Sequence, residues 1–267
     1  AALLVRRFRG ATGGEPVAML ALLLMLSPLF VENATFAWTK LPAAFFILAG
    51  LHFTVRAGRA PDDLRTRCAA LCLAAALLTH YSAAPYAIVL AVAWLFQRRP
   101  DWGRAGFWAA LLRPVFIAVV LLATWFIWAG RHYGSATFLS NTVVTDTAGQ
   151  TMWRQMTLRA VNLLNTLVPH PLRPAGYAFV QQASTYSWWR DYFFNLYQTN
   201  LPLAFGSGGP VVLAVLIRRH YRGSSVFWRG FVVAVVLLNI VVVSWPDRWG
   251  ATHIGLQPLV ILGLAWL

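Results

Sequence analysis

Long apolar blocks separated by short arginine-rich connections are the feature that most restricts the fold of this chain. Hydrophobic residues make up 59% of its 267 residues and charged residues only 11%, whereas soluble domains carry about 25% charged residues. About 20 apolar residues suffice for a helix to cross the hydrocarbon core of a bilayer, which is roughly 30 Å thick. We therefore predict an all-α, polytopic transmembrane helix bundle and exclude a soluble domain.

About eight spans are predicted from these blocks. The stretch from Arg67 to Gln97 is too long for one span and is interrupted at His80–Pro85, so we divide it into two short helices, with Pro85 in the first turn of the second. Such a break at membrane depth must face protein or a water-filled cavity. The predicted spans lie near residues 16–31, 41–57, 67–80, 84–97, 113–130, 201–217, 226–245 and 252–267.

Membrane topology explains the formal net charge of +14 better than nucleic-acid binding does. Cytoplasmic loops carry the excess of Lys and Arg in membrane proteins. With eight spans, one alternating set of connections holds Arg6, Arg7, Arg9, Arg56, Arg59, Arg65, Arg67, Arg98, Arg99, Arg104, Arg218, Arg219 and Arg222. The opposite short loops hold only Lys40 and Arg248 as cations. We therefore expect a protein of the bacterial inner membrane with a cytoplasmic N-terminus and an extracytoplasmic loop at 131–200.

A helical pattern within that long loop predicts an amphipathic helix lying in the membrane interface. Its apolar face consists of Trp153, Met156, Val161, Leu164, Leu167 and Val168. Its polar face consists of Arg154, Gln155, Arg159, Asn162 and Asn165.

Ionisable groups on the outward side are the candidates for chemistry, because charges near the bilayer are costly unless paired or solvated. Glu32 and Lys40 share the first outward loop, where a carboxylate can serve as an acid, a base or a metal ligand and an ammonium can bind phosphate. The further candidates for substrate binding are His80, Tyr81, Arg131, His132, Arg248 and His253. Together these cations and histidines suit an anionic, lipid-borne head group.

Each candidate also has an ordinary structural explanation that the pattern alone leaves open. Glu32 and Lys40 can be surface charges at span ends, and His80 can be a helix-end histidine bonded to the backbone. Arg131 and His132 can anchor a span at the interface, and Arg248 can pair with its neighbour Asp247. Cys68 and Cys72 have no cluster of Cys or His around them in the sequence, so we interpret both as packing residues and predict no metal site of that kind.

Four local sequences resemble motifs of the polyprenyl-phosphate-sugar-dependent glycosyltransferases of the GT-C fold, which include protein mannosyltransferases and the lipid A aminoarabinose transferase. They occur in the family's order and on the predicted outward side. Lys40 stands where that family usually has Asp, and His80 where it usually has Lys. The four are Ser27-Pro28-Leu29 through Glu32 to Thr39-Lys40-Leu41-Pro42, then Leu78-Thr79-His80-Tyr81-Ser82, then Trp125 with Gly130-Arg131-His132-Tyr133-Gly134, and last Asp247-Arg248-Trp249 with Gln257-Pro258-Leu259.

The resemblance implies an inverting transferase that takes a sugar from a polyprenyl-phosphate donor on the extracytoplasmic face and passes it to a lipid, glycan or protein. It implies a principal catalytic Asp in a loop upstream of this segment, with Glu32 as a second acidic position near the donor phosphate or a divalent cation. The alternatives are a transporter or flippase of lipid-linked sugars, a lipid-linked glycan polymerase or ligase, and a non-catalytic assembly subunit. The sugar, the acceptor and the metal dependence do not follow from the sequence.

Overall fold

The computed structural model describes residues 15–27, 39–57, 63–134, 151–157, 201–205, 208–223, 226–239 and 257–266, together with a few single positions between them. The described residues form helices and turns, with no β-strand among them. The helices are α2 (Glu15–Leu26), α4 (Lys40–Arg56), α5 (Leu64–Thr79), η1 (Tyr81–Ala83), α6 (Ala84–Gln97), η2 (Arg99–Asp101), α7 (Phe107–Tyr133), α10 (Leu201–Ala204), α11 (Gly209–Gly223), α12 (Val226–Leu238) and α13 (Gln257–Trp266). The all-α prediction is confirmed for this part of the chain.

The chain divides into two compact units. We call residues 39–146 the central unit, and residues 1–38 with 147–267 the terminal unit. The central unit contains α4 to α7, and the terminal unit contains α2 and α10 to α13. The central unit is thus one continuous stretch of sequence, whereas the terminal unit combines both ends of the chain.

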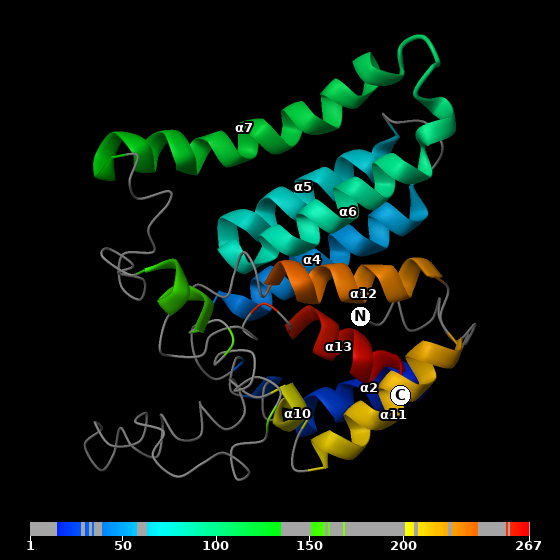
Figure 1. Ribbon diagram of the computed structural model, residues 1–267. Coiled ribbons are helices and arrows are strands. Elements are labelled where there is room, and N and C mark those ends of the chain that lie inside the picture. The colour runs from blue at the N-terminus through cyan, green and yellow to red at the C-terminus, as the bar shows by residue number, and fades with distance from the viewer. Residues whose placement is uncertain are drawn as a thin grey trace. The chain divides into compact units, whose positions relative to one another are not determined.

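Close packing of α4 against α5 organises the central unit (Figure 1). Gly50 of α4 lies directly against Leu73 of α5, so that a Cβ atom on residue 50 would come within 2.8 Å of a Leu73 methyl carbon. The buried small residues of the two helices are Ala43, Ala44, Ala69, Ala74 and Ala76. Small side chains let helix backbones approach closely, which is how helices associate in lipid without a hydrophobic driving force.

We predict that Gly50→Val destabilises the protein, because its side chain must displace Leu73. Overpacking of this kind costs about 1–3 kcal/mol in the free energy of unfolding. Gly230→Val is the matched control, since a Cβ at Gly230 of α12 meets no atom within 4 Å, and its effect should stay within about 0.5 kcal/mol. Unfolding titrations of the two purified variants in detergent measure both values, and equal effects would refute the close packing.

Helix α7 is the one helix in the described ranges that is long and apolar enough to cross a membrane. Its 27 residues extend over roughly 40 Å at 1.5 Å per residue. Only 6% of its most apolar stretch is buried, whereas the core helix of a soluble protein would be largely covered. A continuous apolar surface of this size in water would be highly unusual. The helix therefore indicates association with a membrane.

The predicted spans match the observed helices to different degrees. Span 41–57 corresponds to α4 and spans 67–80 and 84–97 to α5 and α6, while α7 begins six residues before the predicted span 113–130. Apart from α7, the four-residue α10 and the three-residue η1 and η2, the described helices have 10 to 17 residues. The bundle of eight spans accordingly stays a prediction.

The predicted span 201–217 is wrong as a single helix. Helix α10 ends at Ala204 and α11 begins at Gly209. Gly209 lies so close to the carbonyl group of Pro202 that no side chain fits at this position. This tight approach between neighbouring helices depends on tertiary packing, so the apolar pattern did not reveal it.

Packing in the terminal unit joins α2 to the carboxyl-terminal helices. Leu20 of α2 shares a buried cluster with Ala204, Val260 and Leu264. The hydroxyl of Ser27 donates to the Ala204 carbonyl at 3.1 Å, in a buried hydrogen bond. The end of α2 is thus held by residues far away in the sequence.

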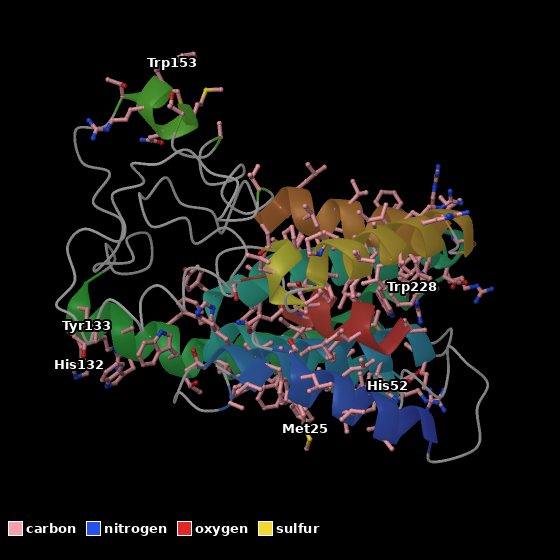
Figure 2. The ribbon with its side chains drawn as sticks, turned by 90° about the horizontal axis from the view of Figure 1, so that it is seen from below. Met25, His52, His132, Tyr133, Trp153 and Trp228 are labelled. Carbon is pink, nitrogen blue, oxygen red and sulfur yellow. The ribbon has the colours of Figure 1, made fainter. Side chains whose placement is uncertain are left out.

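The amphipathic helix predicted in the 131–200 loop is described only at its beginning. Residues 152–157 are helical, and Trp153 is 77% exposed (Figure 2). Most of the remaining residues of that prediction lie outside the described residues. Its location in the membrane interface stays a prediction.

We predict that a charge at the centre of α7 prevents its insertion into a membrane. Val119 lies in the middle of the helix and is 55% exposed. Val119→Arg should raise the apparent free energy of insertion by about 2.5–3.5 kcal/mol, the cost of arginine at a helix centre. A glycosylation reporter that carries residues 107–133 measures insertion, with Val119→Leu as control. Equal insertion of the two variants would argue against α7 as a span.

Candidate functional site

The predicted break between α5 and α6 is present. Helix α5 ends at Thr79, the one-turn 3-10 helix η1 follows at Tyr81–Ala83, and α6 begins at Ala84 with Pro85 in its first turn. His80 lies in the break with an extended backbone. Its own amide donates to the Ala76 carbonyl at 2.9 Å, and its carbonyl accepts from the Ala83 amide at 3.0 Å. The backbone on both sides of His80 is therefore tied to regular structure.

The imidazole ring of His80 caps η1 through one nitrogen. The Ser82 amide donates to His80 Nδ1 at 3.2 Å, and the Ser82 hydroxyl lies 2.8 Å from the same atom. Because Nδ1 accepts from an amide, the proton of the neutral ring resides on Nε2. Tyr81 stacks on the ring, with 4.6 Å between the ring centroids. His80 thus has the helix-end role that the sequence left open. Its Nε2–H is a second polar group of the ring, which does not take part in the Ser82 contacts.

Lys40 lies at the same end of the central unit as His80. It is the first residue of α4, α4 contacts η1, and the Lys40 ammonium is near enough to act electrostatically on His80. The amino termini of α4 and α6 also lie at this end, and helix amino termini carry partial positive charge. At the end of α5, the His80 amide and the Thr79 hydroxyl occupy the Ala76 and Ala75 carbonyl oxygens. The arrangement favours an anion.

Arg131 and His132 occupy a separate helix end. They form part of the last turn of α7 and are exposed, and Figure 1 shows this end of α7 standing apart from the end of α5. The His132 ring stacks on Trp128 at 4.7 Å between centroids, and its Nδ1 donates to the Trp128 carbonyl at 2.9 Å (Figure 2). Cations here complement the helix dipole. Their geometry agrees with the anchoring role that the sequence left open.

The other predicted site residues, Glu32, Arg248 and His253, lie outside the described residues. Within the described ranges, no three His, Cys, Asp or Glu side chains are grouped so that they could hold a metal ion. Of the predicted site residues, the structure brings Lys40, His80 and Tyr81 to the same end of the central unit.

Arg98 lies at the opposite end of the central unit. The sequence pattern indicated it only as one of the arginines expected on the cytoplasmic side. It is buried, and its guanidinium lies 4.1 Å from the centroid of the Trp94 ring. Burial lowers the pKa of Arg98, and the nearby carboxylates of Asp63 and Asp101 oppose that shift. The spacing of Trp94 and Arg98, one helical turn apart, was the available signal.

No protein family model, curated protein or solved structure matches the chain. Functional inference therefore depends on the residues and their geometry.

We predict that His80→Asn preserves stability while His80→Ala lowers it. The Asn side-chain oxygen can accept from the Ser82 amide two residues on, in an Asx turn, whereas Ala leaves that partly buried amide without its partner. The loss for Ala should be about 0.5–1.5 kcal/mol in the free energy of unfolding. Unfolding titrations in detergent compare the two variants with the unchanged protein. If both variants behave alike, the ring does not cap η1.

Proposed function

We propose that the protein is an integral-membrane glycosyltransferase. It moves a sugar from a polyprenyl-phosphate-linked donor to a lipid, glycan or protein acceptor on the extracytoplasmic face. In this proposal the helices form a GT-C-type bundle of about eight spans in the bacterial inner membrane, with the N-terminus in the cytoplasm. The observation that carries it is that Lys40, at the start of α4, acts electrostatically on His80 at the break between α5 and α6.

The chemistry of the reaction explains why such a pair is useful. The leaving group is a lipid phosphate, whose negative charge grows as the glycosidic bond breaks. Donors fixed beforehand around that oxygen lower the barrier selectively, because they interact more strongly with the transition state than with the bound donor. The Lys40 ammonium and the His80 Nε2–H are two such donors, and the amino termini of α4 and α6 add partial positive charge.

The family resemblance implies roles for the remaining residues of the predicted site. Glu32 is the second acidic position, close to the donor phosphate or to a divalent cation. Arg131, His132, Arg248 and His253 are further substrate-binding candidates, and Tyr81 contributes a hydroxyl beside His80.

The exposed apolar surface of α7 supports the lipid part of the proposal. A polyprenyl chain is soluble only in the bilayer, so the enzyme must present its site to the membrane. A helix that is apolar and uncovered over most of its length supports a position of the central unit in the bilayer, where such a substrate is found.

The transferase assay uses the full-length protein in proteoliposomes with radiolabelled polyprenyl-phosphate sugars. Lys40→Gln and His80→Asn should each reduce sugar transfer by about 10²-fold, the usual effect of removing one transition-state donor. Arg248→Ala should also lose most of the rate. Arg104→Gln is the matched control, because Arg104 is an exposed arginine paired with Asp101 at the opposite end, and it should transfer at the unchanged rate. Because His80→Asn keeps the Ser82 contact, its loss of rate would reflect the missing Nε2–H.

The same assay separates the rival functions. Broken helices also occur in transporters, which is the specific observation in favour of a flippase of lipid-linked sugars. Movement of labelled donor across the bilayer without any glycosyl product would establish the flippase and refute the transferase. A product that grows by repeated addition of lipid-linked units would instead identify a glycan polymerase or ligase.

A further inference from the structure

A groove with a volume of about 440 Å³ opens between α5 and α7 in the central unit. Its lining consists of Arg67 from α5 and of Leu112, Arg113, Phe116 and Ile117 from α7. Two arginines therefore contribute to an otherwise apolar lining, and the described lining contains no carboxylate. Each guanidinium carries five N–H donors, so an arginine can bind a group of the protein and a ligand at the same time.

The position of the groove along the helices corresponds to the depth of lipid head groups. Arg67 is three residues from the start of α5 and Arg113 six residues from the start of α7, which is about 5–9 Å along the helix axes. Both lie toward the end of the central unit where Arg98 and Arg104 are found, opposite to Lys40 and His80. The groove is therefore distinct from the candidate transferase site.

The apolar part of the lining distinguishes a lipid from a free anion. Leu112, directly before Arg113, is 66% exposed, and Phe116, about one turn further toward the middle of α7, is 67% exposed. A phosphate held by Arg67 and Arg113 would place its attached chain along these side chains. Inorganic phosphate would use the cations and leave the apolar wall uncovered.

We propose that this groove binds an anionic phospholipid, with its phosphate between Arg67 and Arg113 and the beginning of an acyl chain on Leu112, Phe116 and Ile117. Charge complementarity favours an anionic head group, because the charged residues of the described lining are both arginines. Basic pockets between membrane helices bind anionic head groups in this way. The proposal rests on the chain lying in a bilayer and not on the transferase activity.

Native mass spectrometry of the full chain in detergent tests the groove. The probes are phosphatidylglycerol and phosphatidylcholine, titrated separately. Phosphatidylglycerol should bind at least about tenfold more tightly than phosphatidylcholine. Arg67→Gln and Arg113→Gln should each weaken phosphatidylglycerol binding by roughly fivefold, the effect of one cation near a membrane surface, and leave phosphatidylcholine unchanged. Arg104→Gln removes the same charge from a side chain outside the groove and should stay within about twofold.

Equal affinity of the unchanged protein for both lipids would overturn the proposal, and so would an Arg104→Gln effect as large as that of Arg67→Gln. Displacement of the lipid by equimolar inorganic phosphate would also overturn it, because that result would indicate a site for a free anion. Arg67→Lys and Arg113→Lys keep the charge should the Gln variants fail to fold. They should bind phosphatidylglycerol within about threefold of the unchanged protein, and a loss of selectivity between the two lipids in these variants would equally refute the site.

Discussion

The close approach of α4 and α5 is the contact on which the candidate site depends. Gly50 and the buried alanines let the two helices run side by side, which brings the first residue of α4 next to the residue that follows α5. Lys40 and His80 are 40 positions apart in the sequence, and they meet because these helices are antiparallel neighbours. A wider spacing between the helices would separate the Lys40 ammonium from the His80 ring and leave each as an ordinary helix-end residue.

The central unit has two chemically different ends. At one end, Lys40 and His80 lie with the amino termini of α4 and α6, and no carboxylate occurs among the described residues from Thr39 to Lys40 or from Thr79 to Pro85. At the other end, Asp63 caps α5 and Asp101 pairs with Arg104, so that part of the arginine charge is balanced within the protein. The described residues at the first end carry positive charge and those at the second carry both signs. That contrast is why we propose the leaving-group phosphate of a sugar donor for the first end and a bound lipid for the groove near the second.

The sequence predicted helix type and most helix positions well where the apolar pattern is bounded by strong local signals. The break at His80 was predicted because Pro85 and the excess length of the block both indicate it. The split between α10 and α11 was missed, because it depends on the contact of Gly209 with Pro202. For the site, the pattern indicated Lys40 and His80 but not their proximity, nor the Ser82 contact that assigns the His80 proton to Nε2. Those features arise from tertiary packing and from the conformation of one turn.

The buried hydrogen bond from Ser27 to the Ala204 carbonyl joins residues that are 177 positions apart. The central unit, in contrast, is a continuous stretch of chain, in which α5 packs mainly against α4 and α7. During synthesis, the central unit can complete its contacts soon after residue 133 has emerged. The contacts of α2 with Ala204, Val260 and Leu264 can form only after α10 and α13 have been synthesised. Because local contacts form faster than distant ones, assembly should proceed from the middle of the chain outward, with the terminal unit closing last. A chaperone or the insertion machinery would meanwhile have to shield the apolar face of α2.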